Sequence, residues 1–252
     1  MSPGTGLPGA FAAGAGRIAR YLACRGRDLE AFALPQRCPG CGAPADPRRL
    51  LCASCLERIP RLSVPLCVRC LVRAPAGSGA ERAAACAAHP DHQAWPACLY
   101  DERAAALIHA LKYGERPPLA GVLAGLLERA LPPVPRFDLV VEVPLQAARL
   151  RERGYNQATL LAQALAERIG VPWLAGALVR ARPTRPQARL GPAARRANLA
   201  GAFRAPRPGW LEGRNVLVVD DVLTTGATLE ACFEAVRSAG GRPTGAAVAW
   251  AQ

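Results

Sequence analysis

The alternation of helical and strand patterns in the second half of the chain predicts a mostly parallel sheet. Apolar residues recur at helical spacing from Ala104 to Leu111, and this helix is expected to stop at Gly114 because two prolines follow. Residues 119–131 and 156–170 repeat the helical pattern, and the short apolar run at residues 137–144 predicts a buried strand between them. This order is typical of α/β folds with helices on both faces, in which ligands bind beyond the carboxyl ends of the strands.

The last strand–helix unit of the pattern is "VLVVDDVLTTGATLEACFEA". Val216 to Val219 form the expected buried strand, and Asp220 and Asp221 follow at its carboxyl end. A turn of small and hydroxylated residues comes next, and a helix follows it. The turn consists of Thr224, Thr225, Gly226, Ala227 and Thr228, and the predicted buried face of the helix consists of Leu229, Cys232, Phe233 and Val236.

The acid pair and the turn together predict one kind of ligand. Small turn residues let several backbone N–H groups point at one spot beside the positive end of a helix, and a phosphate is the natural occupant of such a site. The two carboxylates would repel a phosphate unless they held something else, and ribose hydroxyls and Mg²⁺ are what carboxylates hold well. The stretch therefore predicts a 5-phosphorylated ribose, with phosphate and diol a few ångströms apart.

Other interpretations of this stretch fare less well. A response-regulator receiver carries its acid pair near the start of the domain, whereas the pair here is close to the end of the chain. A Walker loop needs a lysine after its last glycine, and a dinucleotide fingerprint needs a glycine spacing that is absent. A purely structural strand, turn and helix remains open, although it would not require two adjacent acids.

The first part of the chain is organised by cysteines. We expect a loop and an amphipathic helix (about Arg17 to Leu34) within residues 1–34, a cysteine-rich module at residues 35–98, and the α/β domain at residues 99–252. Three Cys-x-x-Cys steps and one Cys-x-x-His step predict two tetrahedral zinc sites. The first site would use Cys38, Cys41, Cys52 and Cys55, and the second Cys67, Cys70, Cys86 and His89, with His92 as the spare ligand.

One zinc with a degenerate second site is an alternative for these cysteines, and redox or disulfide chemistry is another. Disulfides require an oxidising compartment, but the N-terminal segment has no basic residue before its apolar part and fits a signal peptide poorly. A cytoplasmic location is therefore expected. Four protein ligands close a zinc site, so both metals should be structural. Cys24, Cys98 and Cys232 are predicted to be buried small apolar residues.

The chain is strongly basic. The net charge of +13 favours polyanionic partners such as nucleic acid or phosphorylated metabolites. Lys112 is the only lysine among 32 basic residues, which suggests that its position needs a compact ammonium, although chance retention is an alternative. His109, one helical turn earlier, is expected to be a packed core histidine rather than a catalytic one. No apolar run approaches the roughly 18 residues of a membrane span.

Residues 216–228 resemble the signature of type I phosphoribosyltransferases. Together with the segments "LIHALKYG", "VPLQAARLRERGYNQATLLA" and "RARPTRPQARLGPAARRANLAGAF", and with the paired Cys-x-x-Cys steps before them, they resemble the ComF family of competence-associated proteins. That resemblance implies a double zinc ribbon followed by a type I phosphoribosyltransferase-like domain, and a link to uptake of transforming DNA. The chain departs from the family pattern at Cys86 and His89, where a fourth Cys-x-x-Cys is usual.

Phosphoribosyl transfer from phosphoribosyl pyrophosphate (PRPP) requires cations at the pyrophosphate, since negative charge develops there. Arg149 and Arg153 match the family pattern and are favoured over Arg151, and Lys112 is a candidate point charge. Further candidates for pyrophosphate, ribose or acceptor are Tyr155, Asn156, Arg180, Gln187, Arg195 and Asn198, of which the polar ones would otherwise tie down loops.

Two functions remain open. The first is a magnesium-dependent phosphoribosyltransferase with an unidentified acceptor. The second is a non-catalytic ribose-phosphate sensor that engages single-stranded DNA or competence-machinery proteins through its basic surface and zinc module. No aromatic residue lies between Ala239 and Trp250 to stack on a base, which slightly favours a non-purine acceptor or no turnover, unless Trp250 or Tyr155 supplies the ring.

Overall fold

The computed structural model describes residues 37–45, 50–71, 86, 88–114, 116–132, 137–184 and 191–252. The expected N-terminal helix, Cys24 and Gln187 lie outside the described residues. None of the helices in the described ranges is long and apolar enough to cross a membrane.

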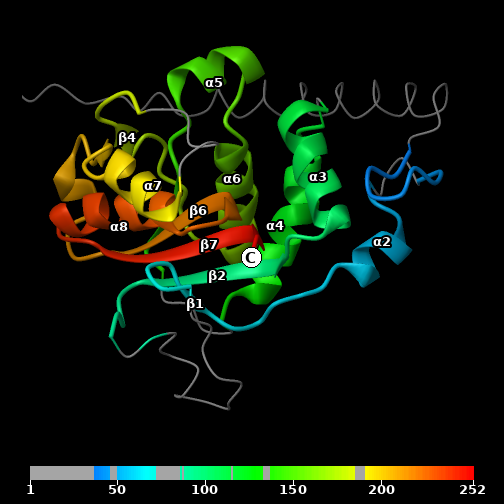
Figure 1. Ribbon diagram of the computed structural model, residues 1–252, viewed down its shortest axis with the longest axis horizontal. Helices are drawn as coiled ribbons and strands as arrows, with labels where there is room; N and C mark the ends of the chain where they lie inside the picture. Colours follow the sequence, from blue (N-terminus) through cyan, green and yellow to red (C-terminus); the bar gives the residue numbers. More distant parts are fainter. Residues whose placement is uncertain are drawn as a thin grey trace, which may run out of the picture.

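One five-stranded sheet organises the molecule (Figure 1). Its order is β1 (Leu66–Cys67), β2 (Gln93–Leu99), β7 (Arg242–Trp250), β6 (Asn215–Leu223) and β3 (Leu139–Glu142). β1 is antiparallel to β2, and the other neighbours are parallel. The expected mostly parallel α/β sheet is confirmed. β4 (Val179–Arg180) and β5 (Phe203–Arg204) form a separate antiparallel pair.

Helices cover both faces of this sheet. α3 (Glu102–Tyr113), α4 (Leu119–Ala130) and α6 (Gln157–Ile169) pack on one face, whereas α8 (Ala227–Ser238) packs on the other and contacts α7 (Pro192–Leu199). α5 (Ala147–Arg153) follows β3, and a short 3-10 turn, η3 (Pro208–Trp210), precedes β6. α2 (Ala53–Arg58) lies at the opposite end of the molecule from α7 and α8 (Figure 1).

The core consists of two apolar layers separated by the sheet. Along β6, Leu217 and Val219 join the layer of α3, α4 and α6, whereas Val216 and Val218 join the layer of α8. Successive strand residues point to opposite faces, and an apolar side chain on each face explains the continuous run of β6. The four residues predicted for the buried face of α8 are all buried.

Local capping sets the helix ends close to where the pattern predicts them. The Asp101 carboxylate accepts a hydrogen bond from Ala104 N–H at 2.8 Å and begins α3, which ends before Gly114. The side chain of Asn156 accepts from Ala158 N–H and begins α6, and Gly170 ends it in the left-handed conformation with φ 68°.

Three features differ from the expectations. β6 does not end at Val219, because backbone pairing with β7 continues to Leu223 and includes both aspartates. The border expected between residues 98 and 99 falls within β2, which belongs to the same sheet as β6. His109 is exposed on α3 with its ring centroid 4.9 Å from that of Tyr113, so the prediction of a core histidine is wrong.

Candidate functional site

The acid pair lies at the carboxyl edge of the sheet, next to the end of α3. Asp221 is only 5% exposed, and its Oδ2 atom is 2.9 Å from the Lys112 ammonium. The backbone N–H of Asp221 donates to Asp220 Oδ1 at 2.8 Å. Because the two side chains point to opposite sides of the strand, only Asp221 forms the ion pair with α3. The single lysine of the chain is thus brought to the predicted site.

Asp220 carries the strongest electrostatic perturbation of the site. Burial of its carboxyl group raises the pKa of Asp220 from 3.8 to about 7, and the neighbouring Asp221 charge acts in the same direction. The backbone N–H of Asp221, and then the charges of Lys112 and Arg180, oppose this rise. A cation bound beside Asp220 would offset the cost of burying its carboxylate, because the positive charge stabilises the ionised form.

The turn after β6 forms a small hollow at the start of α8. It is lined by Asp220, Val222, Leu223, Thr224, Gly226, Ala227, Thr228 and Leu229. Gly226 is the N-cap of α8 and has φ 75°, and no side chain makes a capping hydrogen bond there. The first N–H groups of a helix have no intrahelical partner, so this end of α8 is suited to an anion.

Arg180 approaches the acid pair from β4, which pairs with β5. Its guanidinium donates to the Pro144 carbonyl at 3.1 Å and to Thr184 Oγ1 at 3.0 Å, and it lies 4.8 Å from the ring centroid of Phe203. Burial lowers the pKa of Arg180, whereas the Asp220 charge raises it. Arg180 therefore contributes positive charge near Asp220 while it ties β4 to Pro144, which follows β3.

Two of the other predicted arginines lie on α5 and contact residues other than the acid pair. Arg149 is 54% exposed on α5 and pairs with Glu152 at 2.8 Å. Arg153 bonds to Gln157, and its guanidinium lies 4.8 Å from the ring centroid of Tyr113. Through that ring Arg153 is brought beside the end of α3, which carries Lys112. Arg195 lies on α7.

The polar candidates form hydrogen bonds that join separate elements of the fold. The Tyr155 hydroxyl donates to the Leu111 carbonyl. The amide of Asn156 donates to the Val143 carbonyl at 3.0 Å while its oxygen caps α6, so its side chain ties the α5–α6 connection to the end of β3. Asn198 lies on α7, where its carbonyl accepts from Arg182.

Trp250, one of the two rings suggested for stacking on a base, is buried in the apolar layer of α8. Tyr113, which is not among the predicted site residues, is 53% exposed. Tyr113 directly follows Lys112, so its position at the end of α3 was visible in the sequence. Its exposure depends on how α3 meets α5.

The first cysteine cluster has the geometry of a tetrahedral metal site. The sulfur atoms of Cys38, Cys41, Cys52 and Cys55 all lie within 4.8 Å of one another. The Sγ atoms of Cys41 and Cys52 are 3.7 Å apart, close to the roughly 3.8 Å edge of a tetrahedron with Zn–S bonds of about 2.3 Å. The four thiols therefore fit zinc.

The second cluster joins Cys67, Cys70, Cys86 and His89. His89 Nδ1 lies 3.7 Å from Cys70 Sγ and 3.5 Å from Cys86 Sγ, near the roughly 3.6 Å expected between a nitrogen and a sulfur ligand of zinc. His92 is not part of this group of ligand atoms and instead contacts His89 edge-on, with ring centroids 5.6 Å apart.

The comparisons with known proteins agree with this architecture. Residues 93–252 match the phosphoribosyl transferase domain, and residues 29–88 match the double zinc ribbon domain. The chain belongs to the phosphoribosyl transferase domain family. Because the domain match begins at residue 93, it includes all of β2, and the sheet of this family member starts before the expected border.

Individual relatives confirm the resemblance to competence-associated proteins. The chain is 34% identical over 198 residues to the DNA utilization protein YhgH of Salmonella typhi, covering 76% of this chain and 74% of the relative. It is 34% identical over 148 residues to competence protein F of Haemophilus influenzae, covering 56% and 65%. A solved adenine phosphoribosyltransferase of Thermoanaerobacter pseudethanolicus is 19% identical, with a TM-score of 0.35, covering 54% of this chain and 81% of that one.

Proposed function

We propose that this protein binds PRPP with Mg²⁺ at the loop that starts at Asp220. The observation that carries the proposal is the juxtaposition of Asp220 with the N-terminus of α8 in one hollow. Backbone N–H groups there suit the 5-phosphate, and the acid pair suits the ribose hydroxyls. Membership of the phosphoribosyl transferase domain family supports the same ligand.

Different residues of the site would contact different groups of the ligand. Thr224 is exposed and Thr225 and Thr228 are partly exposed, so their hydroxyls can add hydrogen bonds to the phosphate. Mg²⁺ supplies positive charge to the pyrophosphate when it is bound. Lys112 is the protein's own candidate for that charge, and it must leave Asp221 to reach the ligand. Tyr113 ends α3 next to Lys112, and Arg153 lies over its ring, so both side chains can flank the ligand.

A role in handling DNA is the second part of the proposal. Relatives of the chain bear the names DNA utilization protein and competence protein, and the net charge of +13 suits a polyanion. Binding of single-stranded DNA should therefore weaken steeply as salt is raised. Fluorescence anisotropy with a labelled oligonucleotide at several salt concentrations measures this, and salt-independent binding would contradict it.

The ligand proposal is tested by calorimetric titration of ribose 5-phosphate and PRPP, with and without Mg²⁺. Asp220→Asn and Asp221→Asn should each reduce the affinity strongly. Asp138→Asn is a matched control, because Asp138 accepts a hydrogen bond from Asn215 N–H at the opposite end of β6. If folded, zinc-replete protein takes up neither compound, the proposal fails.

Catalysis is decided by release of pyrophosphate from PRPP in the presence of Mg²⁺ and a panel of bases or single-stranded DNA. Turnover that is lost in Asp221→Asn identifies a transferase. The ion pair between Lys112 and Asp221 favours the alternative, a non-catalytic sensor. In this pair Lys112, the residue proposed to stabilise the pyrophosphate leaving group, is already bound to Asp221. Tight binding of PRPP without pyrophosphate release would identify that sensor.

A further inference from the structure

The second zinc cluster lies directly against the loop proposed to hold the 5-phosphate. Cys67 ends β1, and the next residue, Val68, is fully buried. The Val68 carbonyl is so close to Gly226 that a Cβ atom on Gly226 would lie only 1.8 Å from its oxygen. The Val68 backbone N–H in turn donates to the His92 carbonyl at 2.8 Å. The segment between two predicted zinc ligands is therefore packed on the N-cap of α8.

Arg196 on α7 ties the same two segments together. Its guanidinium donates to the Arg69 carbonyl at 2.5 Å and to the Thr225 carbonyl at 3.2 Å. One guanidinium thus joins the turn between Cys67 and Cys70 to the turn between β6 and α8. The planar fork of arginine suits such simultaneous contacts, which a lysine could not reproduce.

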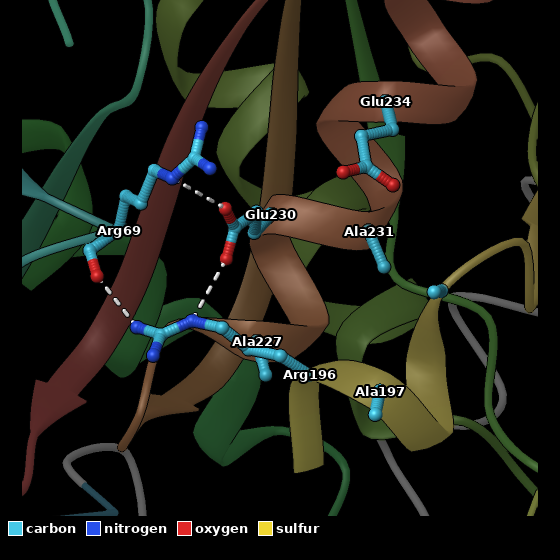
Figure 2. Close-up of a pocket in the computed structure, with 8 residues that line it drawn as sticks. Arg69, Arg196, Ala197, Ala227, Glu230, Ala231 and Glu234 are labelled. Atoms are coloured by element: carbon cyan, nitrogen blue, oxygen red, sulfur yellow. Dashed lines mark hydrogen bonds and ion pairs between the residues drawn. The ribbon is translucent and has the colours of Figure 1, made fainter. Parts of the chain in front are cut away.

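Glu230 completes the connection from the first turn of α8. Figure 2 shows its carboxylate between the side chains of Arg69 and Arg196, at 3.5 Å and 3.0 Å. These residues form one wall of a cavity of about 280 Å³ beside α7 and α8. Glu230 is largely buried, so its charge needs both arginines as compensation. Without them it would place a negative charge four residues from the N-cap that is proposed to face a phosphate.

We infer that the second zinc cluster and Arg196 act as a clamp that preorganises the turn at residues 224–228, the phosphate loop. Metal held by Cys67, Cys70, Cys86 and His89 fixes the Val68–Arg69 backbone, and that backbone with Arg196 fixes Thr225 and Gly226. A loop that is already held in its binding conformation loses less conformational entropy on binding, so its affinity is higher. The inference rests on the proposed function, because it makes affinity for ribose 5-phosphate depend on this metal.

The first cluster provides an internal contrast. Cys38 and Cys55 belong to the apolar layer of α3, α4 and α6, on the opposite face of the sheet from α8. Val68 belongs to the layer of α8 itself. Loss of metal from the first cluster should therefore leave the phosphate loop in place, whereas loss from the second should release it.

The first experiment compares Cys70→Ser with Cys41→Ser, since both cysteines are exposed members of their clusters. Calorimetric titration with ribose 5-phosphate should show about tenfold weaker binding in Cys70→Ser, because the released loop must be ordered on binding, and little change in Cys41→Ser. Amide hydrogen exchange, measured without ligand, should speed up at residues 224–230 in Cys70→Ser alone. Zinc content is measured in both variants to confirm that one metal is lost from each.

The second experiment compares Arg196→Gln with Arg168→Gln. Arg168 on α6 pairs with Glu128 on α4 at 2.6 Å, so both variants break an arginine–glutamate pair between two helices. A purely structural role for Arg196 predicts that affinity stays unchanged when urea unfolding shows comparable stability losses. The clamp predicts that only Arg196→Gln weakens ribose 5-phosphate binding, by about tenfold.

The outcomes separate the inference from the function on which it rests. If wild-type protein binds ribose 5-phosphate and Cys70→Ser binds it equally well, the clamp is refuted and the proposed function stands. If wild-type protein binds neither ribose 5-phosphate nor PRPP, the proposed function fails, and the exchange rates at residues 224–230 still test the clamp. Equal protection of these residues in Cys70→Ser and Cys41→Ser would overturn it.

Discussion

Replacement of Gly226 by alanine is the most direct perturbation of the contact between the zinc module and the phosphate loop. Gly226 has φ 75°, a region that alanine enters at a cost of about 1–2 kcal/mol. Its new Cβ atom would also lie 1.8 Å from the Val68 oxygen, whereas real Cβ contacts are essentially never shorter than 3.0 Å. The obstacle is backbone rather than a flexible side chain, so the Val68 carbonyl must retreat by more than 1 Å.

That retreat has a cost that the structure allows us to estimate. Val68 is fully buried, and its N–H donates to the His92 carbonyl at 2.8 Å. Weakening one buried hydrogen bond costs about 1 kcal/mol, and disturbed packing of the valine adds about 1 kcal/mol more. With the backbone strain, and less the roughly 0.4–1 kcal/mol that alanine contributes through the unfolded chain, Gly226→Ala should lower the free energy of unfolding by about 3 kcal/mol.

Gly213→Ala is the matched control. Gly213 has φ 69°, but a Cβ atom there would meet nothing within 4 Å. This variant therefore carries the backbone strain alone, about 1 kcal/mol after the entropic stabilisation that alanine brings through the unfolded chain. Urea unfolding of both variants at one fixed zinc concentration measures the difference, which should be about 2 kcal/mol or more.

Ribose 5-phosphate titration of the same two variants gives the functional readout. Gly226→Ala should bind more weakly than wild type, and Gly213→Ala should bind equally well. If the two variants unfold at the same urea concentration and bind alike, the contact between Val68 and Gly226 does not constrain the loop, and the reasoning is refuted.

Three further predictions concern other parts of the molecule. The pKa of Asp220 is raised from 3.8 to about 7, so the stability of the ligand-free protein should fall as pH rises from about 4 to about 7. Thermal unfolding at pH 5 and pH 8 should show a smaller pH dependence for Asp220→Asn, which should be more stable than wild type at pH 8. An unchanged pH dependence would disprove the pKa shift. Lys112→Met leaves the Asp221 charge buried without its partner and should lower the free energy of unfolding by about 2 kcal/mol. This is below the usual range for fully buried pairs because Lys112 is partly exposed. In urea unfolding, Lys112→Met/Asp221→Asn should recover stability relative to Lys112→Met, and no recovery would mean that the pair contributes nothing. Trp173→Phe removes the 2.8 Å hydrogen bond from Nε1 to Glu142 and should cost about 1–2 kcal/mol in urea unfolding, whereas a neutral effect would show that water replaces the indole.

Much of the site is already visible as local pattern. The acid pair, the small turn and the helix after it are neighbours in sequence, and the Cys-x-x-Cys steps place two sulfurs on one turn. Helix ends are local as well, because caps such as Asp101 and Gly170 act on the turn next to them. Short-range geometry is sufficient for these features.

The extent of β6 is a contrasting case. Asp220 and Asp221 interrupt the apolar run of β6, and the strand continues past them because the backbone of β7 pairs with it up to Trp250. Backbone hydrogen bonds form whatever the side chains are, so the residues themselves give little sign of this pairing. His109 and Tyr113 are exposed for a related reason, since α3 meets the sheet through Leu107, Ile108 and Leu111.

By itself, the sequence determined the chemistry of the site and the order of its elements, because motif residues are held by bonds along the chain. Only the tertiary structure decided that Val68 lies on Gly226, that Lys112 meets Asp221, and that Arg153 lies over the ring of Tyr113. The reason is physical: these contacts join segments far apart in the chain, and their partners are selected by which faces of the helices the sheet buries.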